Sequence, residues 1–103
     1  MNLNNAYIYI LSNKNRTVLY IGITNDLERR MAEHKSGTGS AFTKKYNISE
    51  LLYYEVFDKI IDAIKREKQL KEWKREWKFE LIKTMNSELL DLAVDWSSEI
   101  TEK

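Results

Sequence analysis

The chain has 103 residues, the length of one domain. It contains no cysteine, which excludes a disulfide framework, a thiolate metal site and a thiol nucleophile. No apolar run approaches the roughly 20 residues of a membrane span, and no signal-peptide pattern opens the chain, so we expect a cytoplasmic protein without membrane contact. Residues 1–82 contain 15 of the 17 basic and 11 of the 16 acidic residues, a net charge of +4, whereas residues 83–103 carry −3. This mild basic excess fits transient contact with phosphate groups.

Two strands joined by a tight turn are predicted near the start of the chain. Residues 7–11 and 18–21 are rich in β-branched and aromatic side chains. Between them, residues 13–16 read Asn-Lys-Asn-Arg, which is turn chemistry. If these strands pair as a hairpin, Tyr9 and Tyr20 lie on neighbouring strands and can share a face.

A helix is predicted to follow the hairpin. Asn25 is interpreted as its N-cap, with Glu28 three residues further on. Arg30 and His34 are four residues apart and therefore on one helical face. Residues 36–40, Ser-Gly-Thr-Gly-Ser, end this helix and begin a flexible loop. Two phenols, a guanidinium group and an imidazole are thus expected to converge.

Residues 41–46, Ala-Phe-Thr-Lys-Lys-Tyr, interleave two aromatic residues with two lysines. One interpretation is a nucleic-acid contact, in which Lys44 and Lys45 bind backbone phosphates and a ring stacks on an unstacked base. The favoured alternative is a short helical turn that packs Phe42 and Tyr46 into the core and leaves both lysines in solvent.

A third strand is predicted at residues 51–57, either central in its sheet or covered on both faces, because it is apolar almost throughout. Asp58 is interpreted as the N-cap of a long helix that begins near Lys59. Its length predicts a break or bend near residues 73–77. Trp73 and Trp77 are expected in the core, with a protein-interaction surface formed by these tryptophans and residues 89–96 as the alternative.

Glu67 stands out in this long helix because it is embedded in an otherwise core-facing row. Its carboxylate would lose hydration there unless a cation or hydrogen-bond donors meet it. The alternative is a residue at the flank of the row that pairs with Lys71 at i,i+4 spacing. The row follows i, i+3 and i+7 spacing and contains Ile60, Ala63, Glu67, Leu70, Lys74, Trp77 and Leu81.

From about Tyr7 to about Leu92, which is nearly the whole chain, the sequence resembles the GIY-YIG nuclease superfamily. Residues 7–9, Tyr-Ile-Tyr, and residues 20–22, Tyr-Ile-Gly, are similar to the two triplets that name the family. The continuation to Arg30 resembles short single-domain members, which are related to the N-terminal nuclease domain of an excinuclease. Three positions depart from the family pattern: Tyr7 replaces the first glycine, Ile23 replaces the lysine of the excinuclease branch, and Ser87 replaces a proline.

The predicted fold is a small α/β (α+β) domain of the GIY-YIG type over residues 1–95, with residues 96–103 as a C-terminal tail. Its sheet is expected to have three strands, mainly antiparallel, with helices on its faces. The resemblance implies an endonuclease that hydrolyses DNA phosphodiester bonds with Mg²⁺ or Mn²⁺. The DNA structure is left open between branched and single-stranded forms, and the pathway and protein partners are also open.

The resemblance also implies roles for individual side chains. Tyr20 is interpreted as the general base and Tyr9 as an orienting hydroxyl, although which phenol is the base is left open at this point. Arg30 is the phosphate clamp, and Glu67 the single protein ligand of the metal. His34 is a further catalytic residue, which positions Tyr20 or shuttles a proton. The supporting residues are Gly22, which permits close backbone approach where strand meets loop, and Asn86, which braces the site. The alternative function is a catalytically weak or inactive nucleic-acid-binding module, which the departures at Tyr7 and Ile23 favour.

Overall fold

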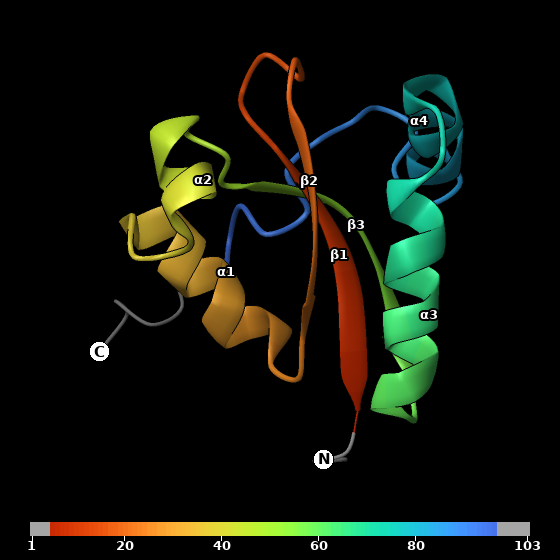
Figure 1. The fold of residues 1–103 in the computed structure, drawn as a ribbon. Helices are drawn as coiled ribbons and strands as arrows, with labels where there is room; N and C mark the ends of the chain where they lie inside the picture. Colours follow the sequence, from red (N-terminus) through yellow and green to blue (C-terminus); the bar gives the residue numbers. More distant parts are fainter. Residues whose placement is uncertain (1–4, 97–103) are drawn as a thin grey trace.

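A computed structural model describes residues 5–96 of the chain. Its three strands form one antiparallel sheet in the order β2-β1-β3, with β1 between its two partners (Figure 1). The predicted α+β fold, with a three-stranded antiparallel sheet, is therefore confirmed. The elements in chain order are β1 (Ala6–Ser12), β2 (Leu19–Thr24), α1 (Leu27–Ser36), α2 (Ala41–Lys45), β3 (Glu50–Phe57), α3 (Ile60–Lys71) and α4 (Arg75–Lys83).

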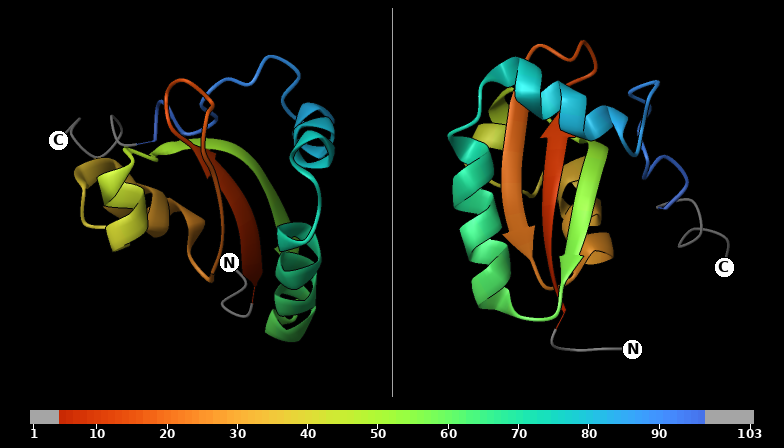
Figure 2. Two further views of the ribbon diagram at one scale, coloured as in Figure 1. Left: turned by 45° about the horizontal axis from the view of Figure 1, so that its top comes forward. Right: turned by 90° about the vertical axis from the view of Figure 1, so that its right-hand side faces the viewer.

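Helices cover both faces of this sheet. In Figure 1, α1 and α2 lie on one side of the strands and α3 and α4 on the other. Figure 2 shows α3 running alongside β2, while α4 crosses over the strands near one end of the sheet. Among the helices of residues 5–96, none combines the length and the apolar character that a bilayer span requires.

The sheet separates two hydrophobic clusters, and β1 contributes to both. Ile8 and Ile10 pack in the cluster that includes Ala63 and Leu70 of α3, whereas Tyr9 and Leu11 pack in the cluster that includes residues of α1. All four of these β1 side chains are fully buried. This double coverage explains why the sequence of β1 is apolar at successive positions instead of alternating.

The third strand was predicted to be either central or covered on both faces, and the first alternative was wrong, because β3 is an edge strand. Leu51 and Leu52 near its start are buried in opposite clusters, so this half is covered on both faces. Val56 near its end is 51% exposed. The segment after α4 returns to the start of β3, where the Leu92 backbone N–H donates to the Leu51 carbonyl at 2.8 Å.

Two helix starts differ from the predicted ones. The N-cap of α1 is Asp26 and not Asn25, and its carboxylate accepts a hydrogen bond from the Arg29 backbone N–H at 3.1 Å. Asp58 does not cap α3, which begins one residue later with Lys59 as N-cap and without a side-chain cap bond. Gly37 ends α1 in the left-handed conformation with φ of 85°, as the Ser-Gly sequence predicted.

The long helix is interrupted at residues 72–74, close to the predicted break. Beyond it, Trp77 is 50% exposed, so its predicted core position was wrong, whereas Trp73 packs against the core. Ala63 and Leu70 of the predicted inward row are buried, but Ile60 is exposed. Of the predicted tail at residues 96–103, all but the first residue lie outside the described part of the chain.

Candidate active site

The two tyrosines of the triplets share one face of the hairpin, as the sequence predicted. Tyr9 lies opposite Gly22 in the β1–β2 register, and Tyr20 lies opposite Leu11. Tyr9 and Tyr20 are therefore diagonal neighbours across the two strands. Their ring centroids are 6.4 Å apart. Tyr9 is fully buried, whereas Tyr20 is partly exposed.

Gly22 makes room for the Tyr9 ring. A Cβ atom at position 22 would overlap the hydroxyl group and the Cζ atom of Tyr9. The close approach expected at Gly22 is thus present, and the approaching group is a side chain from the neighbouring strand. The residue is internal to β2, which extends to Thr24, so it does not lie at the junction of strand and loop that the sequence indicated.

His34 reaches the same place from α1. Its Nε2 atom lies 3.4 Å from the Tyr9 hydroxyl oxygen. The imidazole also meets both phenol rings edge-on, with centroids 5.9 Å from Tyr9 and 6.0 Å from Tyr20. Its Nδ1 atom lies 3.1 Å from the Thr43 hydroxyl oxygen of α2. His34 is therefore held from two sides, by a strand and by a second helix.

The hydrogen bond from Thr43 to Ser40 favours the tautomer in which Nδ1 of His34 carries the proton. The Thr43 hydroxyl donates to the Ser40 carbonyl at 3.0 Å, so towards His34 its oxygen acts as an acceptor. The His34 Nδ1–H group then donates to Thr43, which leaves the lone pair of neutral His34 on Nε2. This lone pair accepts the hydrogen of the Tyr9 hydroxyl.

The pKa shifts of Tyr9 and His34 favour their neutral forms. Burial, reinforced by the neighbouring Tyr20 phenol, raises the pKa of Tyr9 to about 12 despite the opposing effect of the Arg30 guanidinium. Burial also lowers the pKa of His34 below its ordinary value, and the positive charge of Arg30 adds to this effect. At neutral pH, Tyr9 therefore keeps its proton and His34 remains uncharged.

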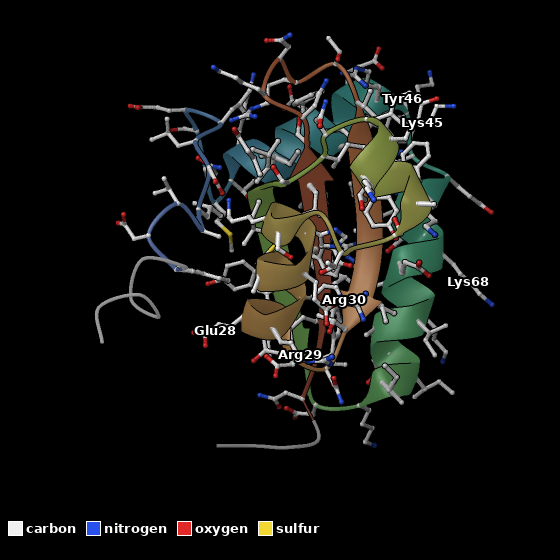
Figure 3. All side chains as sticks on the ribbon, turned by 90° about the vertical axis from the view of Figure 1, so that its left-hand side faces the viewer. Glu28, Arg29, Arg30, Lys45, Tyr46 and Lys68 are labelled. Atoms are coloured by element: carbon white, nitrogen blue, oxygen red, sulfur yellow. The ribbon has the colours of Figure 1, made fainter. Side chains whose placement is uncertain are left out.

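Arg30 lies on α1, one turn before His34. Its Nε atom is buried and has no hydrogen-bond partner among the described residues. This Nε atom lies 3.2 Å from Glu33 Oε1, so the two groups form an ion pair without the alignment of a hydrogen bond. Figure 3 shows Arg30 between α1 and β2, with Glu28 on the other side of the helix. The adjacent Arg29 is more exposed and pairs with Asp26 and Glu33.

Glu67 is not part of the hydrogen-bonded cluster. It lies on α3, between the buried positions Ala63 and Leu70, and its Oε2 atom forms an ion pair with Lys71 Nζ at 2.8 Å. This is the pairing that the alternative interpretation of its sequence position predicted. α3 lies beside β2, the strand that carries Tyr20, as Figures 2 and 3 both show. It packs, however, on the face of the sheet opposite to the cluster that contains Tyr9 and Tyr20.

The remaining predicted residues lie around the cluster. Asn86 is buried, and its side chain binds the Leu52 carbonyl at 3.1 Å and both backbone groups of Leu90. It therefore braces β3 against the C-terminal segment and makes no hydrogen bond to the two tyrosines. Lys44 and Lys45 are exposed on α2.

The favoured interpretation of residues 41–46 was wrong in one respect. The segment is a short helix, but Phe42 and Tyr46 are 46% and 41% exposed, and Thr43 is the residue that points inward. Phe42 stacks on Tyr20 with a centroid distance of 6.0 Å and an interplanar angle of 26°. The α2 helix therefore extends the aromatic cluster to the surface.

Sequence reasoning missed Thr43 and Gly39. A Cβ atom at position 39 would overlap the His34 Nδ1 atom, so this glycine admits the imidazole in the same way that Gly22 admits Tyr9. Ser40 caps α2 by accepting from the Thr43 backbone N–H. The spacing of Ser40 and Thr43 is typical of a helix start and could have revealed the helix, but it carries no information about His34.

Comparison with known proteins identifies the family of the chain. The family model described as the GIY-YIG catalytic domain matches residues 5–80. The chain therefore belongs to the GIY-YIG family, a nuclease domain family whose membership implies endonuclease-type function and a nucleic-acid substrate.

Several relatives are small proteins of similar length. A UPF0213 protein of Staphylococcus saprophyticus is 40% identical over 76 residues, which cover 74% of this chain and 92% of the relative. A UPF0213 protein of Streptococcus pyogenes is 39% identical over 89 residues, covering 85% and 96% respectively. The solution NMR structure of a UPF0213 protein from Bacillus halodurans is similar with a TM-score of 0.51 at 25% identity, covering 96% of this chain and 99% of the other.

Proposed function

We propose that the chain is a divalent-metal-dependent endonuclease that hydrolyses DNA phosphodiester bonds. The observation that supports this proposal most is the buried Arg30 Nε–H group, which makes no hydrogen bond within residues 5–96 and belongs to a guanidinium that acts electrostatically on Tyr9 and His34. The Glu33 carboxylate 3.2 Å away forms an ion pair with this group but no aligned hydrogen bond, and a bound phosphate would supply the aligned acceptor. The planar guanidinium group is suited to two phosphate oxygens at once.

The two phenols have different environments, and this difference divides their roles. The Tyr9 hydroxyl is directed to His34, and a pKa of about 12 keeps it protonated at neutral pH. Tyr9 is therefore the orienting group, and its hydroxyl oxygen can accept from a further donor. Tyr20 is the partly exposed phenol of the pair, and we assign to its deprotonated form, the phenolate, the removal of a proton from the attacking water, which converts it to the phenol.

Arg30 and His34 complete the protein part of the mechanism. Arg30 binds the phosphate and stabilises the negative charge that grows on its oxygens during attack. The neutral His34 holds the Tyr9 hydroxyl and presents its ring edge to Tyr20, which fixes the position of both phenols. Thr43 in turn fixes the orientation of the imidazole.

The residues present are compatible with Mg²⁺ or Mn²⁺. No group of three or more His, Cys, Asp and Glu side chains that could hold a metal exists within residues 5–96. Mg²⁺ needs no such cage, because it is commonly held by one or two carboxylates together with waters and substrate phosphates. Glu67 would be the single protein ligand, and the bound cation would neutralise charge on the phosphate.

The test compares Glu67→Gln with Lys71→Gln. Both variants remove the ion pair between these residues, but only the first removes the carboxylate. If Glu67 holds the metal, Glu67→Gln abolishes Mg²⁺-supported cleavage of labelled DNA and Lys71→Gln keeps it. Equal cleavage by both variants and by the wild type would remove Glu67 from the mechanism. We also expect Arg30→Ala to lose Mg²⁺-supported cleavage of labelled DNA.

A nucleic-acid-binding module of the same fold is the second candidate, because Glu67 is paired with Lys71 and makes no hydrogen bond or ion pair to the cluster in the described part of the chain. The same samples discriminate between the two functions. Gel-shift of branched, single-stranded and duplex DNA without any cleavage at saturating Mg²⁺ or Mn²⁺ would identify the module. Metal-dependent cleavage would identify the endonuclease.

A further inference from the structure

A continuous row of aromatic rings leads from the buried cluster to the surface. We propose that Phe42 and Tyr46, at its outer end, form a stacking site for one unpaired nucleobase of the substrate, next to the phosphate that Arg30 binds. The inference deepens the proposed function, on which it rests, because it identifies a requirement for an unpaired nucleotide near the cleaved bond.

Ring distances define this row. Tyr20 and Phe42 are stacked with centroids 6.0 Å apart, and Phe42 and Tyr46 follow at 4.8 Å with an interplanar angle of 50°. All of these separations lie in the range in which aromatic rings attract one another. The inner end of the row is the partly exposed Tyr20, the proposed base, so a nucleobase held at Phe42 would place its own phosphate close to the candidate active site.

The fold of α2 does not depend on these two exposed rings. The helix is attached through Thr43, which is buried and binds His34, and through the Ile48 backbone N–H, which donates to the Thr43 carbonyl at 2.9 Å. Ser40 caps its first turn. Phe42 and Tyr46 are nearly half exposed in spite of their size. Single exposed apolar residues are common, but two adjoining rings in contact with a candidate catalytic residue mark a binding surface.

The charge around the rings suits a nucleic acid. Residues 35–49 include three lysines and no acidic residue. Lys35 is engaged with Asp91, whereas Lys44 and Lys45 form no ion pair within the described part of the chain. The Lys45 ammonium group lies 5.3 Å from the centroid of the Tyr46 ring. Aromatic rings flanked by lysines are the usual means of holding a single nucleotide strand, since the rings stack on bases and the lysines attract phosphates.

A stacking site at Phe42 distinguishes unpaired nucleotides from nucleotides within a duplex. Within a duplex, both faces of each base are covered by neighbouring bases, so no face is available to Phe42. A base in a single strand, a flap or a bulge has a free face. Stacking on an aromatic side chain is largely indifferent to which base is present, so the site is expected to select for an unpaired nucleotide and not for a sequence.

Binding without catalysis tests this inference independently of the proposed function. In EDTA, the affinity of a fluorescein-labelled single-stranded oligonucleotide is measured by anisotropy, alongside the duplex of the same sequence. Phe42→Leu keeps the apolar volume but removes the aromatic face, and Phe42→Trp keeps a larger face. Trp77→Leu is the matched control, because Trp77 is an equally exposed aromatic residue on α4.

We expect Phe42→Leu to weaken single-strand binding by about tenfold while duplex binding changes little, which is a typical loss for one base stack. Phe42→Trp and Trp77→Leu should bind like the wild type. A 2-aminopurine base in the oligonucleotide should be quenched by the wild type and not by Phe42→Leu. The inference would be overturned if Phe42→Leu lost affinity equally for single strand and duplex, or lost none. It would also be overturned if the wild type bound neither form of DNA. Selective loss in a chain that never cleaves DNA would support the stacking site and refute the endonuclease.

Discussion

Tyr9 and Gly22 face each other across β1 and β2, and the Tyr9 ring occupies the space that a Cβ atom at position 22 would fill. The ring is fully buried and cannot turn into solvent. The last glycine of the second triplet is therefore explained by the packing of the first triplet's tyrosine. The two triplets form one unit in the folded chain.

We predict that Gly22→Ala lowers the free energy of unfolding by about 1–3 kcal/mol, the usual effect of an added methyl group in a packed core. The displaced ring would also lose its hydrogen bond to His34. Urea denaturation followed by circular dichroism measures the effect. Gly37→Asn is the control, since a Cβ atom at Gly37 meets nothing within 4 Å and Asn tolerates its left-handed conformation. Equal stability of Gly22→Ala and the wild type would contradict the packing described.

A second prediction concerns pH. Because burial and Arg30 lower the pKa of His34 in the folded state, the unfolded chain binds more protons once the pH falls below the ordinary histidine value of about 6.5. The contribution of neutral His34 to the free energy of unfolding is therefore fully present above about pH 6.5. It decreases as the pH falls towards the pKa of His34 in the folded state. Glu33, the neighbouring acidic group, opposes the shift but does not cancel it.

The chain contains one histidine, so the effect can be isolated. Melting temperatures of the wild type and of His34→Gln are compared between pH 7.5 and 5.5. The melting temperature of the wild type should fall between pH 7.5 and 5.5, whereas that of His34→Gln should remain nearly constant. Parallel curves would show that His34 is not held in its neutral form.

A third prediction separates charge from shape at Arg30. Arg30→Lys keeps the positive charge but loses the planar group that binds two phosphate oxygens together. Cleavage of a labelled DNA should slow at least about tenfold, an amount typical of one lost charge-assisted contact in a transition state. Arg29→Lys, on the exposed side of the same helix, should cleave normally. Equal rates in both variants would exclude Arg30 as the phosphate clamp.

The sequence predicted those parts of the fold that local patterns determine. The hairpin, the Gly37 helix end and the shared face of Tyr9 and Tyr20 follow from β-branched and aromatic content, turn residues and strand pairing. The helical spacing of Arg30 and His34 placed both beside the tyrosines. These relationships span few residues and need no knowledge of the rest of the chain.

Other features depend on contacts between distant segments, and sequence reasoning failed there. β1 and β3 are both apolar, and only the pairing order shows that β1 has two neighbours. In α2, a helix of five residues is too short for its periodicity to reveal the inward side. The contact between Thr43 and His34 turns Phe42 outward.

The measurement that tests the central claim most directly is single-turnover cleavage of end-labelled DNA with Mg²⁺ by the wild type and by Tyr20→Phe. This substitution removes one hydroxyl group and keeps the ring that contacts His34 and Phe42. We predict cleavage by the wild type and a rate at least about 100-fold lower in Tyr20→Phe, the lower end of the contribution of a general base. Cleavage by Tyr20→Phe at the wild-type rate would contradict the assignment of this cluster as the active site.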